Sequence, residues 1–395
     1  MPFCPVPRDE VELRIARLQS SLQHQGIDGV LMVQGVDVAY FSGTPYADFV
    51  YLPAEGEPLI LYEQSNAQRE PSCEYLPIKR IEDIPGVLEE AYGRTPSTLG
   101  LELDVISAKE FEVYSRIFDV KRLVDASSLI LKVRAIKSEW ELEQMGKAAQ
   151  ITRQVFENIR SVIRPGLTEM ELAAKAEAHA QCVALAPIDI RVRDYKTEGY
   201  PWHVLSGKSG GMVGLLDSPT SGEGTSAAFP CGAGFKPIGE DEPVMVDFAY
   251  ELNGYHMDET RMFCVGTMSD LARKAAEAAI EIHDWVLEHV RPGVTVGELF
   301  EHSVAKAREL GYEEEYLGPL GYKVNFVGHG IGAELVEYPV IAGKKEDELR
   351  PGMTFALEPK IVFKDQFIAG VESVFTVTER GYQLISQVPV EIFIC

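Results

Sequence analysis

The chain has 395 residues, of which 46% are apolar and 25% charged, and its formal net charge at pH 7 is −24. This composition is typical of a globular protein, and the length favours two domains. The acidic charge argues against a nucleic-acid partner, because that binding depends on Lys and Arg that neutralise phosphates. No apolar run approaches the roughly 20 residues that a membrane-spanning helix needs, so we expect no membrane partner either.

The cysteines and the N-terminus bear on the cellular compartment. The six cysteines are scattered and form no CxxC pair, which predicts a reduced protein without structural disulfides or zinc knuckles. The first ten residues lack the basic-then-apolar order of a secretion signal. Together these features predict a cytoplasmic enzyme.

The first third of the chain has the pattern of a small α/β domain, which we place at residues 1–133. Apolar residues at three- and four-residue spacing predict an amphipathic helix over residues 9–25, and Gly26 ends it. Short apolar strands are expected at residues 29–33, 58–62 and 99–103. Strands that alternate with helices indicate an α/β fold. No cluster of catalytic residue types occurs in this region.

A second α/β domain is predicted over residues 134–395, and it contains an internal repeat. Ser138 and Glu141 fit a capping box that starts a long helix. Residues 163–172 have the pattern Ile-Arg-Pro-Gly-Leu-Thr followed by Glu-Leu, and residues 290–299 repeat it as Val-Arg-Pro-Gly-Val-Thr followed by Glu-Leu. This repeat is too long and has too few copies for a solenoid. It predicts two related halves with a functional site at their pseudo-twofold interface.

Two aspartates flank a predicted hairpin in this domain. Asn253 and Gly254 between two alternating segments are a strong hairpin signal. Asp247 and Asp258 are 11 residues apart (258 − 247) around that turn, which places both side chains on one face of the strand pair, directly or diagonally opposite. Asp247 also ends an apolar run, where a buried charge requires compensation. Because no Lys or Arg lies between the two aspartates, they predict a metal ion.

The second half of the domain repeats this arrangement. Glu358 ends an apolar strand and Glu372 opens another, at nearly matching offsets from the two aspartates (358 − 247 is 111 and 372 − 258 is 114). Between the halves lies His329, flanked by glycines that permit close backbone approach. Four carboxylates and one imidazole suit two divalent ions of the Mn, Co, Zn or Fe type. Shared carboxylates would hold such ions about 3.5–4 Å apart.

With these residues the chain resembles the M24 metallopeptidases, which include methionine aminopeptidase, prolidase and aminopeptidase P. Supporting motifs are Gly-Tyr-x-x-Asp-x-Thr-Arg at 254–261, Gly-His-Gly-Ile-Gly at 328–332, Leu-Glu-Pro at 357–359 and Val-Thr-Glu-x-Gly at 377–381. The resemblance implies a pita-bread catalytic fold over residues 134–395, a creatinase/prolidase-like N-terminal domain over residues 1–133, and a homodimer. It also implies a dinuclear site with the metal ligands Asp247, Asp258, His329, Glu358 and Glu372. Glu358 would in addition be catalytic, passing a proton to the leaving amine.

Two histidines that bind substrate in that family are missing from this chain. The position seven residues after His329 is Val336, and the segment that usually holds the other histidine has Cys231 instead. We therefore take Val336 and Cys231 as candidate substrate-binding residues, together with His203, whose loop the sequence alone does not place. His256, two residues before Asp258 on the same strand face, is first interpreted as a residue that holds an aspartate, and it is also the first candidate for a catalytic donor that replaces the missing histidines.

Three functional hypotheses follow. The first is a dinuclear metal-dependent hydrolase of the Xaa-Pro aminopeptidase or dipeptidase type, which releases N-terminal residues from small peptides. The second is a metal-dependent enzyme of the same fold acting on a non-peptide small molecule, because both substrate histidines are absent. The third is a metal-stabilised binding protein without turnover, which the intact ligand set disfavours. The expected partner is a small peptide or peptide-like molecule.

Overall fold

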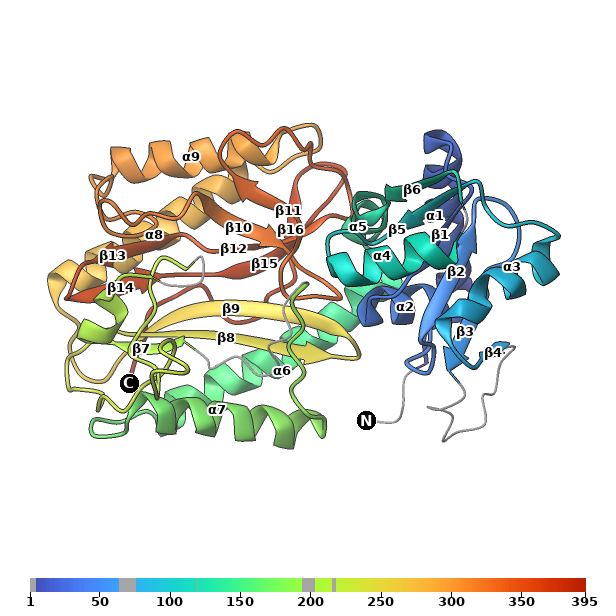
Figure 1. Cartoon of the computed structure of the whole chain (residues 1–395). Helices are drawn as coiled ribbons and strands as arrows, with labels where there is room; N and C mark the ends of the chain where they lie inside the picture. The colour runs from blue at the N-terminus through green and yellow to red at the C-terminus, as the bar shows by residue number, and fades with distance from the viewer. Residues whose placement is uncertain (1–4, 64–75, 119, 194–202, 215–217) are drawn as a thin grey trace. The chain divides into compact units, whose positions relative to one another are not determined.

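A computed structural model describes residues 5–63, 76–118, 120–193, 203–214 and 218–395. The chain divides into an N-terminal unit that ends at Arg134 and a C-terminal unit that runs from Ala135 to Cys395. Figure 1 labels the elements of both units. None of the helices in the described ranges is long and apolar enough to cross a membrane.

The N-terminal unit is built on one mixed sheet of six strands, in the order β4-β3-β2-β1-β5-β6. The strands are β1 (Gly29–Met32), β2 (Phe49–Pro53), β3 (Leu59–Glu63), β4 (Leu76–Ile78), β5 (Thr98–Leu101) and β6 (Arg122–Asp125). The helices are α1 (Arg8–Gln25), α2 (Gly35–Ser42), η2 (Ile81–Asp83), α3 (Ile84–Tyr92), α4 (Ala108–Ile117) and α5 (Ser127–Ala135). The predicted first helix is α1, and Gly26 ends it in the left-handed conformation with φ of 64°.

The C-terminal unit contains three sheets, with strand orders β17-β9-β8-β7, β11-β10-β12-β15-β16 and β13-β14. The strands are β7 (His203–Ser206), β8 (Val244–Leu252), β9 (Tyr255–Cys264), β10 (Phe326–Gly330), β11 (Glu337–Ala342), β12 (Thr354–Leu357), β13 (Lys360–Phe363), β14 (Phe367–Gly370), β15 (Ser373–Val377), β16 (Tyr382–Leu384) and β17 (Phe393–Ile394). The helices are α6 (Glu139–Val162), α7 (Glu169–Ala184), η3 (Gly207–Gly211), α8 (Asp270–Glu288) and α9 (Val296–Glu309). Ser138 and Glu141 form the predicted capping box at the start of α6.

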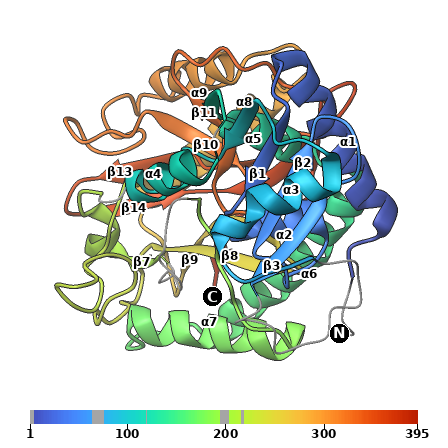
Figure 2. The ribbon, with the colours of Figure 1, turned by 45° about the vertical axis from the view of Figure 1, so that its right-hand side comes forward.

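The predicted internal repeat is visible at the starts of α7 and α9. Thr168 caps α7 and Thr295 caps α9, each in a capping box with a glutamate three residues later. Gly166 and Gly293 precede these caps, and both have φ of 88°. In Figures 1 and 2 the pair α6 and α7 lies on one side of the C-terminal strands, and the pair α8 and α9 lies on the other. The strands between the two helix pairs carry the predicted metal ligands.

The hairpin of β8 and β9 has the two-residue turn that the sequence predicts. Asn253 and Gly254 both have positive φ, of 55° and 86°, as a type I′ turn requires. In the resulting register Asp258 lies opposite Ala249 and Asp247 lies opposite Thr260. The two aspartates are therefore diagonal neighbours on one face of the hairpin.

The turn supplies a stability prediction. A Cβ at Gly254 would meet no heavy atom within 4 Å, so Gly254→Ala tests only the cost of positive φ at this position. We expect the free energy of unfolding, measured with denaturant, to fall by about 1 kcal/mol. The matched control is Gly146→Ala inside helix α6, where a Cβ also meets nothing within 4 Å and the change should stabilise by up to about 1 kcal/mol. Equal effects of the two substitutions would contradict the assigned turn conformation.

Candidate metal centre

Three strands and the ends of two others bring the predicted ligands together. Asp247 lies on β8, Asp258 on β9 and His329 on β10, whereas Glu358 directly follows β12 and Glu372 directly precedes β15. Strand β12 pairs with both β10 and β15, which aligns the last three residues. An isolated bridge between Thr260 and Glu372 then connects β15 to the hairpin. Residues up to 125 positions apart (372 − 247) thus meet where two sheets join.

Three of the five residues fit one divalent cation. The ligand atoms of Asp258, His329 and Glu372 all lie within 4.8 Å of one another. His329 Nε2 is 4.0 Å from Asp258 Oδ2 and 4.0 Å from Glu372 Oε1, which is too long for hydrogen bonds but leaves room for an ion with ligand distances of roughly 2.0–2.2 Å. Asp258 Oδ1 and Glu372 Oε1 are buried and have no hydrogen-bond partner in the described ranges. Such orphaned carboxylate oxygens are expected where a cation binds.

The electrostatics of the two carboxylates agree with this fit. Burial raises the pKa of Asp258 well above its ordinary value, and the negative charges of Glu372, Asp247 and Glu358 raise it further. Burial likewise raises the pKa of Glu372, although Lys360 opposes the shift. Buried carboxylates that crowd one another in this way ionise readily only when a cation joins them.

Neighbouring polar groups orient the ligands. Thr260 Oγ1 donates a hydrogen bond of 2.9 Å to Glu372 Oε2. His329 Nδ1 lies 3.0 Å from the carbonyl oxygen of Gly330, so a proton on Nδ1 leaves the Nε2 lone pair facing the carboxylates. The buried guanidinium of Arg261 bonds the backbone carbonyls of Thr260 and Glu372, which fixes the two segments to each other.

A lysine at the centre was missed by the sequence-based reasoning. Lys360, at the start of β13, is only 3% exposed, and its Nζ lies 3.0 Å from Asp247 Oδ2 and 2.6 Å from Glu358 Oε2. Burial alone would lower the pKa of Lys360, but the three carboxylates of Asp247, Glu358 and Glu372 raise it well above its ordinary value. A signal for this residue was present: Lys360 is two positions after Glu358, and alternate residues of an extended segment point to the same side.

His203, predicted to bind substrate, also lies at the centre. It opens β7, opposite Asp247 in the pairing of β7 with β8, and its Nδ1 is 3.5 Å from Asp247 Oδ2. Burial raises the pKa of Asp247, but Lys360 and His203 together bring it below its ordinary value. Residues 200–202, which precede His203 in the predicted loop, lie outside the described ranges.

His256 contacts backbone groups through both of its ring nitrogens. The backbone N–H of Arg191 donates to His256 Nε2 at 3.1 Å, and Nδ1 lies 2.9 Å from the carbonyl oxygen of Gly332. Burial lowers the pKa of His256 to about 4, so the ring is neutral near pH 7. Both ring nitrogens thus face backbone groups, and a catalytic role for His256 stays a prediction. Neither ring nitrogen holds an aspartate.

The positions of the two missing histidines are unlike each other. Val336 is 38% exposed and directly precedes β11, whereas Cys231 is 3% exposed. Burial raises the pKa of the Cys231 thiol, which disfavours the nucleophilic thiolate. Within the described part of the chain, no hydrogen bond or ion pair joins either side chain to the metal centre.

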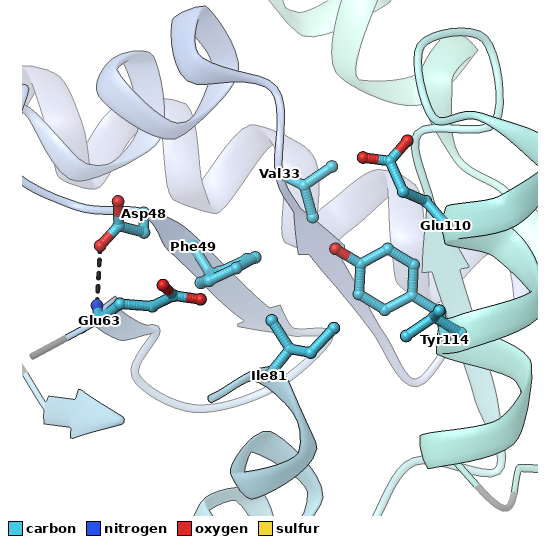
Figure 3. A pocket seen from close by; sticks show the side chains of 8 residues that line it. Val33, Asp48, Phe49, Glu63, Ile81, Glu110 and Tyr114 are labelled. Atoms are coloured by element: carbon cyan, nitrogen blue, oxygen red, sulfur yellow. Dashed lines mark hydrogen bonds between the residues drawn. The ribbon is translucent and has the colours of Figure 1, made fainter. Parts of the chain in front are cut away.

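A separate cavity of about 400 Å³ belongs to the N-terminal unit (Figure 3). Val33, Phe49, Ile81 and Tyr114 form much of its wall. The acidic residues at its rim are Asp48, Glu63 and Glu110. Asp48 accepts a hydrogen bond of 2.8 Å from the backbone N–H of Glu63. None of the predicted site residues lines this cavity.

The contact between Thr260 and Glu372 gives a prediction. Thr260→Val removes the hydroxyl that bonds Glu372 with little change in shape, so we expect the affinity for Mn²⁺ to fall about 10- to 100-fold. Calorimetric titration of the metal-free protein with Mn²⁺ measures this change. Thr260→Ser keeps the hydroxyl and serves as the control, with an affinity close to that of the unchanged protein. An unchanged affinity in the valine variant would show that this hydrogen bond does not orient a metal ligand.

Comparison with known proteins agrees with the geometry. The model of metallopeptidase family M24 matches residues 143–379, and that of the creatinase/prolidase N-terminal domain matches residues 14–136. An Xaa-Pro dipeptidase of Pyrococcus furiosus is 26% identical over 375 residues, which cover 93% of this chain and 96% of that protein. The solved structure of an Xaa-Pro dipeptidase from Bacillus anthracis superposes with a TM-score of 0.80 at 25% identity, covering 98% of this chain and 100% of that one. An X-Pro aminopeptidase structure from Thermotoga maritima, at 22% identity, shares the fold with a TM-score of 0.79 over 96% of this chain and 99% of its own.

The N-terminal α/β domain, the pita-bread catalytic domain and the matching family models agree with one another. The chain belongs to metallopeptidase family M24 and is a peptidase-like hydrolase.

Proposed function

We propose that this chain is a metal-dependent peptidase that hydrolyses small peptides with proline in the second position. The observation that carries the proposal is the buried triad of Asp258, His329 and Glu372, with two carboxylate oxygens that lack partners in the described ranges. The names of its relatives, which include Xaa-Pro dipeptidases, support the choice of substrate. One imidazole and carboxylate oxygens suit Mn, Co, Zn or Fe ions.

A divalent ion at the triad would supply Lewis-acid chemistry, polarising the scissile carbonyl and making water acidic enough to attack it. Glu358 is the proposed proton carrier of this reaction. Its Oε1 is 3.8 Å from His329 Nε2, beside the triad, while Oε2 is held by Lys360. This position suits a carboxylate that accepts a proton from water and delivers it to the leaving amine. His203, beside Asp247, is the proposed polar contact for substrate.

The finer predictions from the sequence stand as parts of this proposal. Homodimer formation and a cytoplasmic location remain predictions, as does a pair of metal ions rather than one. The contacts of Lys360 with Asp247 and Glu358 bear on the number of ions. The third hypothesis, a binding protein without turnover, is disfavoured by membership in a family of hydrolases.

The proposal predicts metal-dependent hydrolysis of Xaa-Pro dipeptides. Protein stripped with a chelator and reloaded with Mn²⁺ should release proline from Ala-Pro and Met-Pro, and chelation should abolish the activity reversibly. Glu358→Gln should lower kcat by about 10²- to 10⁴-fold, because the amide cannot carry the proton. Ala-Ala is the control substrate for the proline requirement. A metal-loaded protein that cleaves no Xaa-Pro or other dipeptide would refute the proposal.

A second candidate function is metal-dependent hydrolysis of a non-peptide small molecule. It is favoured by Val336 and Cys231, which stand where the family's substrate-binding histidines would be. An apolar side chain and a protonated thiol are poor donors to a developing oxyanion. The side chains at these two positions are therefore poorly suited to bind a peptide carbonyl, although the metal triad is suited to hydrolysis.

Restoring one histidine separates the two candidates. We expect Val336→His to raise kcat/KM on Ala-Pro by roughly tenfold or more, because an added donor stabilises the oxyanion in the transition state. Val336→Leu, which adds bulk without a donor, is the matched control and should show no gain. Steady-state kinetics of the Mn²⁺-loaded variants make the comparison. No gain in the histidine variant would favour the non-peptide substrate.

A further inference from the structure

The number of cations at the centre follows from Lys360. We infer that the Lys360 ammonium takes the place of a second divalent ion, so that the centre binds one metal ion per chain. The inference rests on the metal centre of the proposed function and specifies how its negative charge is balanced. The metal ion is assigned to Asp258 and Glu372, and the ammonium of Lys360 is assigned to Asp247 and Glu358.

The hydrogen bonds of Lys360 single out one pair of carboxylates, although its Nζ also lies 3.7 Å from Glu372 Oε2, and His329 Nε2 lies 3.8 Å from Glu358 Oε1. Asp258 and Glu372 share the triad with His329. Asp247 and Glu358 instead hold the lysine, with Nζ 3.0 Å and 2.6 Å from their oxygens. These are hydrogen-bond distances, so the ammonium fills the space between the two oxygens. A second ion bound by the same oxygens would require the amine to leave.

The position of the lysine is built into the fold. In the pairing of β13 with β14, Lys360 lies opposite Gly370. A Cβ at Gly370 would lie 2.8 Å from Lys360 Cγ, so the glycine leaves the space through which the lysine stem passes. The backbone carbonyl of Lys360 also accepts a hydrogen bond of 2.8 Å from the N–H of Leu317. With 3% of the residue exposed, the lysine is buried in this position.

The balance of charge favours the same arrangement. Asp247, Asp258, Glu358 and Glu372 are four buried or nearly buried carboxylates around one point. Two divalent ions would neutralise all four and leave the buried ammonium without a counter-charge, beside two further cations. One divalent ion together with the ammonium leaves a single net negative charge. Burying an uncompensated cation is costly, so the arrangement with one ion is preferred.

An ammonium in place of a second metal ion changes the chemistry that this position can supply. An ammonium donates hydrogen bonds but cannot act as a Lewis acid or bind a water as a ligand. Lys360 therefore orients Glu358 and Asp247 through Nζ, and the free Oε1 of Glu358 faces His329. Lys360 is thus a positioning residue for the proposed proton carrier.

Metal content tests the inference without reference to activity. Full-length protein is stripped, incubated with excess Mn²⁺ and freed of unbound ion, and the metal per chain is measured by mass spectrometry. We expect one Mn²⁺ per chain in the unchanged protein and two in Lys360→Gly, where the amine no longer fills the gap between Asp247 and Glu358. The control is Lys364→Gly in the exposed turn between β13 and β14, which should keep one.

Electron paramagnetic resonance of the same samples gives a second readout. The unchanged protein should show the signal of isolated Mn²⁺, and Lys360→Gly that of an exchange-coupled pair. Two ions in the unchanged protein, or one in a folded Lys360→Gly variant, would overturn the inference. If that variant does not fold, the content and spectrum of the unchanged protein still decide the matter. One ion without peptidase activity would refute the proposed function but support this inference, whereas no bound ion would refute both.

Discussion

Four carboxylates buried around one point are the constraint on which the C-terminal unit depends. Each carboxylate is costly to bury by itself, and crowding adds repulsion that raises the pKa values of Asp258 and Glu372. Positive charge from several sources compensates these carboxylates. Lys360 pairs with two of the carboxylates, Arg261 ties together the backbone segments that carry the others, and the triad is suited to a divalent ion.

The internal repeat explains how such distant residues converge. Each half supplies a capped helix and strands that carry or flank two of the acids, and the two halves meet where Thr260 bridges Glu372. The symmetry is incomplete at the level of charge. The first half contributes Asp247 and Asp258, but the cation that neutralises Asp247 comes from β13 in the second half. A duplicated backbone has therefore produced a centre whose two sides differ in chemistry.

The chain belongs to its family, and the asymmetry is a particular feature of its metal centre. The intact triad and the matching family models support hydrolysis. Polar contacts to Asp247 come from His203 and Lys360. Substrate recognition and the number of ions are consequently the properties in which this chain can differ from its relatives.

Local rules of sequence determined much of this protein. Asn253 and Gly254 specified the hairpin turn, and Thr168 and Thr295 specified two helix starts, because each depends on near neighbours in the chain. The five predicted ligands followed instead from spacing and motifs along the sequence. The tertiary structure alone decided the partners of His256, His203 and Lys360. His256 lies on β9 with Asp258, but the sequence could not reveal that backbone groups of Arg191 and Gly332 face both of its ring nitrogens. Likewise, the contact of Lys360 with Asp247 spans 113 residues and arises only when sheets from both halves join.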